Sequence, residues 1–436
     1  MVPRRATVMA IALSALASSS QAQGANAAPT SFHFVCAGTP ARGATVLDGR
    51  TVYDAKAGYG FHEAVSDAAV GRCASDRPFL FDVALAEGNY DVTVILGDAV
   101  PSVTTVKAES RRLMVEQVRT RAGESVTRRF TVNVRTPYMA GGDSVRRKPR
   151  EVGSATWDDR LTLEFGGEHP SVREISIAPA HDPVTVYLAG NSTVVDQAVE
   201  PWAAWGQMIP RFFQPGSVVV ANHAESGETL KAFIGEHRLA KVLTALKRGD
   251  YLFIEFAHND QKAGSSHVEP FTTYKEYLGK FIDEAQSRGA TPVLVTSMHR
   301  RSFDSTGHIM NTLGDYPAAM RQLAEERHVA LVDLNAMSKL FYEALGPVQS
   351  TKAFVHYPAG TYPGQATELK DDTHFNNYGA YELARMMVQG LRVSGLPLAR
   401  LLLPDIAPFD PSHPDPLDTF TLPASPVAVI AKPAGS

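Results

Sequence analysis

The sequence predicts a multidomain chain: an N-terminal antiparallel β-sandwich, followed by an α/β three-layer domain with a doubly wound parallel sheet. Apolar and polar residues alternate with a period of two from about residue 31 to residue 178. From residue 184 onward, short apolar runs alternate with amphipathic helical stretches. The 436 residues also exceed the ~100–200 that one domain usually holds, so we expect two folded units.

Four segments of the first part have the alternation that is typical of half-buried antiparallel strands. They are residues 79–83, 90–94, 130–134 and 161–165. Turns such as Glu87-Gly88-Asn89 separate the strands, which favours a β-sandwich. Residues 136–157 carry Arg146, Arg147 and Lys148 among glycines and polar residues, and we interpret them as a long loop whose charges are solvated.

The period changes around Pro179-Ala180-His181-Asp182-Pro183. The later apolar runs are continuous, as expected for strands that are buried on both faces. They are residues 184–188, 218–221, 251–256, 292–296 and 330–332, with helical stretches that include residues 202–213, 272–288 and 316–327 between them. Strict alternation of strand and helix predicts a parallel sheet covered on both faces.

The first residues have the features of a secretory signal peptide. Arg4 and Arg5 precede an uncharged apolar stretch over residues 6–17, and Ala25-Asn26-Ala27 fits a cleavage site. We therefore divide the chain into a signal peptide (1–27), a β-sandwich (28–180), a catalytic α/β domain (181–403) and a C-terminal tail (404–436). The tail holds eight prolines, so we expect it to lie extended over the surface or to be mobile.

Export would place the protein in the periplasm or outside the cell. In such an oxidising compartment Cys36 and Cys73 could form one disulfide, and the alternative is two buried thiols. The 42 Lys and Arg nearly balance the 46 Asp and Glu, which argues against nucleic acid as a partner. After the signal peptide no stretch approaches the ~20 uncharged apolar residues of a membrane span. The sequence does not indicate an oligomeric state.

In open parallel sheets, ligands bind beyond the carboxyl ends of the strands. Polar residues follow three of the predicted strands, at Gly190-Asn191-Ser192-Thr193, Ser226-Gly227 and His258-Asn259-Asp260, and a fourth group lies at Asp371-Asp372-Thr373-His374. Each group alone is typical of an ordinary turn. Together they supply every part that acyl transfer needs.

Ser192 is the candidate nucleophile, and His374 can accept its proton. Asp371, three residues before His374, can hold the other ring nitrogen and stabilise the imidazolium. The N–H groups of Ser192 and Gly227 and the amide of Asn259 would donate hydrogen bonds to the oxyanion. His299 and His356 are alternative bases, but neither has an acid three residues earlier.

These groups resemble the sequence blocks of the SGNH (GDSL-type) hydrolases, and among them the bacterial rhamnogalacturonan acetylesterases. The blocks read G-N-S-T-V-V-D-Q at 190–197, N-H-A-E-S-G-E-T-L-K-A-F at 222–233, F-A-H-N-D-Q at 256–261 and D-D-T-H-F-N-N-Y-G-A at 371–380. The resemblance implies a flavodoxin-like fold, with Ser192, Asp371 and His374 as the triad and Ser192, Gly227 and Asn259 as the oxyanion hole. It also implies no cofactor and no metal.

The resemblance has limits in both parts of the chain. The family usually has Gly-Asp-Ser in the first block and Gly before His-Asn-Asp in the third, where this chain has Asn191 and Ala257. Asn191 keeps an acceptor but loses a charge, which leaves the role of that aspartate open. Residues 53–61 resemble galactose-binding or malectin-like modules, so the first domain is expected either to bind sugar or to act as a stabilising cap.

The sequence therefore predicts an exported serine esterase that deacetylates a plant cell-wall polysaccharide, with the rhamnogalacturonan of pectin as the expected substrate. Candidate substrate-binding residues are His258, Arg300 and Arg301, because arginine pairs with carboxylates such as those of galacturonate. The alternatives are an esterase of acetylated xylan or small acetylated sugars, and a carbohydrate-binding protein with an inactive hydrolase domain. No HExxH, CxxC, GxGxxG or GxxxxGK motif is present, so we predict neither a metal nor a phosphate-bearing cofactor.

Overall fold

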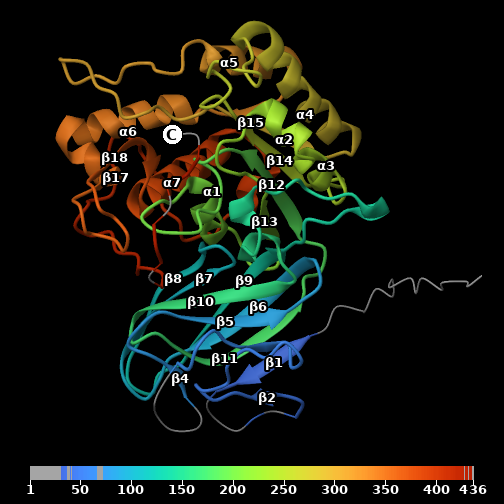
Figure 1. Ribbon diagram of the computed structural model, residues 1–436, viewed down its shortest axis with the longest axis vertical. Coiled ribbons are helices and arrows are strands. Elements are labelled where there is room, and N and C mark those ends of the chain that lie inside the picture. The colour runs from blue at the N-terminus through green and yellow to red at the C-terminus, as the bar shows by residue number, and fades with distance from the viewer. Residues whose placement is uncertain are drawn as a thin grey trace, which may run out of the picture.

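The computed structural model describes residues 31–36, 40, 42–65, 72–426, 428–430 and 432–434. The predicted signal peptide and its cleavage site lie outside these residues. A β-rich region and an α/β region follow each other along the chain and pack against each other (Figure 1). Among the helices described, none has the length and apolar character needed to cross a membrane.

The described part of the β-rich region forms two sheets. The first has the order β2 (Thr45–Val46), β1 (Phe32–Val35), β11 (Ser171–Pro179), β6 (Gly88–Leu96), β9 (Val126–Val134), and β4 (Cys73–Ala74) also pairs with β11. The second has the order β3 (Tyr59–Phe61), β5 (Phe79–Ala84), β10 (Arg160–Glu168), β7 (Ser102–Ala108), β8 (Arg112–Thr120). Neighbours are antiparallel except β1 and β2, and the four strands expected from the alternation are found in β5, β6, β9 and β10.

One apolar core joins the two sheets. Along β6, alternate residues are buried, and Val92 and Val94 belong to the same buried cluster as Phe81 of β5 and Leu163 of β10. The period of two thus directs one face of each sheet toward the other, because successive side chains of a strand point to opposite faces.

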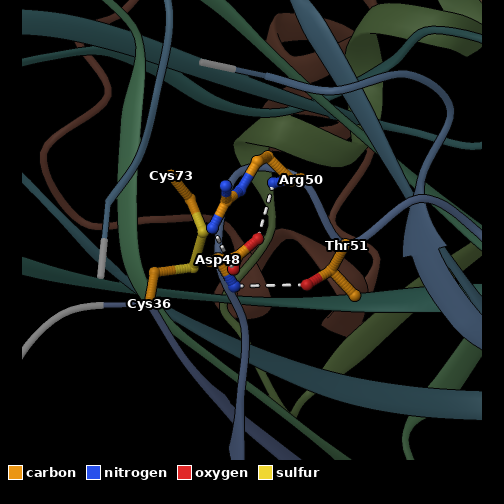
Figure 2. Close-up of a disulfide and its surroundings, with 5 residues drawn as sticks. All are labelled: Cys36, Asp48, Arg50, Thr51 and Cys73. Atoms are coloured by element: carbon orange, nitrogen blue, oxygen red, sulfur yellow. Dashed lines mark hydrogen bonds and ion pairs between the residues drawn. A yellow bond between two sulfur atoms is a disulfide. The ribbon is translucent and has the colours of Figure 1, made fainter. Parts of the chain in front are cut away.

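A disulfide between Cys36 and Cys73 joins the end of β1 to β4, with the two Cα atoms 5.7 Å apart (Figure 2). Both residues are buried, and the bond selects the first of the two alternatives left open by the sequence. Beside it the chain turns at residues 48–51, where the Asp48 N–H donates to Thr51 Oγ1 at 3.2 Å and the Arg50 N–H donates to Asp48 Oδ1 at 2.8 Å.

The α/β region is built on a parallel sheet of order β13 (Val218–Asn222), β12 (Val184–Gly190), β14 (Tyr251–Glu255), β15 (Thr291–Val295), β16 (Ala330–Val332). The chain moves from β12 to one edge and then returns to the other side of β12. This reversal opens a crevice at the carboxyl ends of β12 and β14, which is where such sheets bind ligands.

Helices cover both faces of the sheet. The helices on one face are α1 (Trp205–Met208), α6 (Leu334–Gln349) and α7 (Asn377–Val393), and those on the other are α2 (Leu230–Gly235), α3 (Arg238–Leu243), α4 (Lys275–Ser287) and α5 (Tyr316–Arg327). Along β12, Val186 and Leu188 belong to the first core, whereas Tyr187 and Ala189 belong to the second. The apolar run is continuous because both faces of the strand are buried.

Two local expectations for the α/β region need correction. The helix expected over residues 202–213 is only α1 followed by a 3-10 turn at Ile209–Phe212, because Pro210 lacks the N–H that an α-helix requires. A hairpin of β17 (Phe354–Tyr357) and β18 (Leu369–Phe375) was not expected. Its second strand has the sequence L-K-D-D-T-H-F. The five consecutive polar residues K-D-D-T-H do not show the alternation of a half-buried strand.

The remaining helical segments are short turns. They are Ala140–Gly142, Pro149–Glu151, Ala155–Trp157, Pro270–Tyr274, Ser350–Ala353 and Pro397–Leu401.

The loop over residues 136–157 packs against the α/β region, so the prediction of solvated charges is wrong for Lys148. Its ammonium pairs with the fully buried Glu228, and Arg150 of the same loop pairs with Glu225 at 2.5 Å. Buried carboxylates need a cation to offset their lost hydration, and this loop supplies it.

Residues 404–426 of the tail lie extended over both regions and contain no helix or strand. The Tyr378 hydroxyl donates to the Asp415 carbonyl at 2.8 Å, and Ser425 Oγ lies 2.7 Å from Lys107 Nζ and 2.8 Å from Glu164 Oε1. The first of the two expectations for the tail therefore holds for these residues.

We expect the combined change Cys36→Ser and Cys73→Ser to lower the thermal midpoint of the β-rich region. The disulfide closes a separation of 37 residues, and loss of such a constraint on the unfolded chain costs up to about 4 kcal/mol. Thermal unfolding followed by circular dichroism measures the effect, and reduced wild-type protein should match the double variant. Equal midpoints for oxidised wild type and variant would contradict the prediction.

Candidate active site

Three predicted side chains meet at the carboxyl edge of the sheet. Ser192 lies in the loop that follows β12, and Asp371 and His374 lie on β18. His374 Nε2 is 2.8 Å from Ser192 Oγ, and His374 Nδ1 is 2.8 Å from Asp371 Oδ2. All three residues are buried. Histidine can therefore exchange a proton with the hydroxyl while the carboxylate holds its other nitrogen.

The Asp371 carboxylate is held in its ionised form. Burial alone would raise its pKa, but the hydrogen bond and charge of His374, together with the N–H groups of Thr373 and His374, lower the pKa to about 2. The Trp202 indole N–H also points at Oδ2, at 3.4 Å. A charged Asp371 selects the tautomer with hydrogen on Nδ1 and leaves Nε2 free to accept a proton from Ser192.

The neighbouring loops carry hydrogen-bond donors that are not fully used within the protein. The Glu225 N–H donates to the Gly190 carbonyl at 3.2 Å, which brings the Gly227 loop to the strand end before Ser192. The Asn259 amide donates to the Glu228 carbonyl at 3.0 Å and retains a second hydrogen. Among the described residues, neither the Ser192 nor the Gly227 N–H has an acceptor. These groups can bind an oxyanion.

The two departures from the family pattern leave this geometry intact. Asn191 Oδ1 accepts from the N–H of Thr193 at 3.1 Å and from its hydroxyl at 2.9 Å, so the acceptor role is retained without the charge. Ala257 is buried in the core formed with α4 and α5. Gly227 has φ of +81°, a conformation that suits glycine.

The candidate substrate-binding residues differ in what they contact. Arg300 donates to the His258 carbonyl at 3.2 Å and to the Thr312 carbonyl at 3.4 Å, and among the described residues it has no carboxylate partner. Arg301 instead pairs with Asp372 at 2.8 Å and donates to Ser350 Oγ at 3.0 Å. Arg300 is therefore available to an anionic ligand, whereas Arg301 is engaged within the protein.

The His258 ring is buried, and neither ring nitrogen has a hydrogen-bond partner in the described structure. Burial, and after it the positive charge of Arg300, hold the pKa of His258 well below its usual value, so the ring is neutral. His356, one of the alternative bases, lies 2.9 Å from Asp372. The histidine that contacts Ser192 is His374.

Two groups that were not predicted from the sequence support the Ser192 loop. Gln197 Nε2 donates to the Ser192 carbonyl at 2.7 Å. Glu255, at the end of β14, accepts from Thr193 Oγ1 at 3.2 Å, Ser297 Oγ at 2.9 Å and Trp205 Nε1 at 2.9 Å. A single carboxylate inside the apolar run 251–256 was the available signal for Glu255.

The distal part of the tail also reaches this place. A methyl group on the Cα of Gly227 would lie 3.4 Å from the Ala434 Cβ, and Lys432 and Pro433 line a cavity together with Ser226. Within the described ranges, no group of three or more His, Cys, Asp or Glu side chains is arranged to hold a metal.

The chain is similar to a known protein family and to known proteins. The profile of the GDSL-like Lipase/Acylhydrolase family matches residues 186–380. Rhamnogalacturonan acetylesterase RhgT of Bacillus subtilis (strain 168) is 43% identical over 218 residues, 50% of this chain and 93% of the relative. Probable rhamnogalacturonan acetylesterase YesY of the same organism is 33% identical over 221 residues, 50% of this chain and 97% of the relative.

A third relative covers more of the chain. The uncharacterized esterase YxiM of Bacillus subtilis (strain 168) is 26% identical over 365 residues, which cover 79% of this chain and 86% of the relative. That share exceeds residues 181–436, so the alignment extends into the β-rich region.

We expect the stability of the Glu255→Gln variant, measured relative to wild type, to be greater at pH 8 than at pH 5. Burial raises the Glu255 pKa from 4.5 to about 7, so the folded state holds this proton more tightly than the unfolded state does. The proton on Glu255 stabilises folded wild type fully below pH 4.5, and this stabilisation, at most about 3 kcal/mol, is lost as the pH rises to 7. The variant has no such proton to lose.

Thermal unfolding of both proteins between pH 4.5 and 8 measures the difference in stability between wild type and Glu255→Gln. The exposed Glu276→Gln is the control and should give a constant difference. A Glu255→Gln difference that does not grow with pH would contradict the expectation.

Proposed function

Because the chain belongs to the GDSL-like lipase/acylhydrolase family and is a carboxylic ester hydrolase, we propose that it is an exported serine esterase that removes O-acetyl groups from rhamnogalacturonan. The observation that carries this proposal is the continuous hydrogen-bonded series Ser192, His374, Asp371 beside three donors with free hydrogens. The 43% identity to RhgT supports the choice of an acetylated pectic polysaccharide.

In the proposed reaction His374 Nε2 takes the Ser192 hydroxyl proton while Oγ attacks the acetyl carbonyl carbon. The carbonyl oxygen becomes an oxyanion that accepts hydrogen bonds from the N–H groups of Ser192 and Gly227 and from the Asn259 amide. His374 then gives the proton to the departing sugar oxygen. Water attacks the acetyl-serine by the same steps and releases acetate.

Arg300 is the proposed contact for a uronate carboxylate of the polymer. Its guanidinium is partly buried next to the third block, and no described carboxylate neutralises it. Planar guanidinium groups bind carboxylates through two parallel hydrogen bonds. Arg301 is a poorer candidate because Asp372 already pairs with it.

The division of the chain is part of the proposal. Residues 181–403 are the proposed catalytic domain with a flavodoxin-like arrangement, which the strand order β13-β12-β14-β15-β16 supports. Residues 28–180 are the proposed β-sandwich module of galactose-binding type, which the shared core of its two sheets supports. The Cys36–Cys73 disulfide supports export by the predicted signal peptide, because disulfides persist in oxidising compartments.

We expect Ser192→Ala to reduce acetate release at least about 10³-fold, because no other described hydroxyl takes its place next to His374. Wild type and variant are compared on acetylated rhamnogalacturonan, acetylated xylan and 4-nitrophenyl acetate, with the exposed Ser305→Ala as control. Greatest release from the pectic polymer is the expected result. Release from xylan or the small ester alone would reject the pectin assignment, and no release by folded wild type would favour a binding protein.

We expect Arg300→Met to raise KM for acetylated rhamnogalacturonan about tenfold, which is the loss of one charged hydrogen-bonded contact. The rate with 4-nitrophenyl acetate, which carries no carboxylate, serves as the control and should not change. Steady-state kinetics on the two substrates measures both values. An unchanged KM for the polymer would rule out the carboxylate contact.

A further inference from the structure

Two cations from the β-rich region converge on one carbonyl group beside the active site. Lys148 Nζ donates to the Ser226 carbonyl at 2.9 Å, and Arg150 Nη2 donates to the same oxygen at 2.6 Å. Ser226 is buried, and its carbonyl belongs to the peptide group whose nitrogen is that of Gly227. The two ends of this peptide group therefore face different partners: the oxygen faces two cations, and the N–H has no described acceptor.

A peptide group is planar and conjugated, so its two ends are coupled. Hydrogen bonds from charged donors to the oxygen are stronger than neutral ones, and they draw electron density away from the nitrogen. The N–H at the other end becomes a better donor, and its direction is fixed at the same time. We propose that Lys148 and Arg150 are positioning residues that orient and polarise the Gly227 N–H for the oxyanion.

The cations are themselves held in place by acids on either side of the same peptide. Arg150 Nε lies 2.8 Å from Glu225 Oε1, and the Lys148 ammonium pairs with Glu228. Both carboxylates are buried, and burial raises their pKa values, that of Glu228 to about 7. The segment from Glu225 to Glu228 is thus an acidic turn neutralised from outside its own region.

The segment that carries the cations is fixed to the α/β region by a further ion pair. Glu151 follows Arg150 directly, and its carboxylate accepts from Arg238 Nη1 at 3.0 Å and Nη2 at 2.5 Å. The Trp157 indole also donates to Glu151, at 2.9 Å. This arrangement holds the backbone at Lys148 and Arg150 with little freedom, which is what positioning of the Ser226 carbonyl requires.

The inference rests on the proposed function, because it assumes that the Gly227 N–H binds the oxyanion. Its test uses Lys148→Met, Arg150→Met and the double variant in the full chain. Arg147→Met is the matched control: it lies in the same loop, and its side chain has no hydrogen bond or ion pair within the described residues. The assays are 4-nitrophenyl acetate hydrolysis and inhibition by methylboronic acid, which forms a tetrahedral anion of acetyl size on serine.

Loss of one oxyanion donor costs about 10²–10³ in rate, so weakening one should lower kcat about tenfold in each single variant and more in the double variant. KM should stay within about twofold. Inhibition by methylboronic acid should weaken in parallel with kcat, Arg150→Lys should recover part of the loss, and Arg147→Met should behave as wild type.

Unchanged kcat in the double variant would overturn the inference. A lower kcat with unchanged boronic acid inhibition would also overturn it, because the cations would then act only on general stability. The single variants, which each keep one cation on the Ser226 carbonyl, provide the test if the double variant does not fold. Absence of esterase activity in folded wild type would instead reject the proposed function on which the inference rests.

Discussion

Charge neutralisation between the two regions is the constraint on which the site depends. The α/β region buries Asp196, Glu225 and Glu228 around the loops of the proposed active site, and cations of the β-rich region pair with them. Arg112, for example, lies 2.5 Å from Asp196, and both side chains are almost fully buried. A buried charge without a partner is costly, so pairing with the β-rich region stabilises the observed form of these loops.

The same constraint extends to Ser192, the proposed nucleophile. Asp196 also accepts from the Asn222 amide at 2.8 Å, and Arg111 donates to the Gln197 carbonyl at 3.0 Å. Gln197 in turn donates to the Ser192 carbonyl. Contacts between the regions therefore reach Ser192 through one intervening residue, and the stability of the interface and the geometry of the proposed triad are connected physically.

The parts of the site that could be predicted are those with local sequence signals. Asp371 precedes His374 by three residues, and Ser192 follows an apolar run, so their places at the sheet edge followed from spacing and topology. The pairing of Arg112 with Asp196 could not be predicted, because 84 residues separate the two and either charge alone is typical of a surface. Lys148 was misinterpreted for the same reason. The predicted length of the helix at α1 was too great, because the apolar pattern over residues 202–213 outweighed the single signal of Pro210.

The distribution of partners across the interface has a consequence for protein engineering by domain recombination. The covalent link between the regions is the short segment 180–183, between the end of β11 and the start of β12. The noncovalent contacts that hold the regions together include buried ion pairs such as Arg112 with Asp196 and Glu151 with Arg238. A chimera that exchanges one region must therefore carry the complementary charges of the other, since each broken buried pair costs about 3–5 kcal/mol.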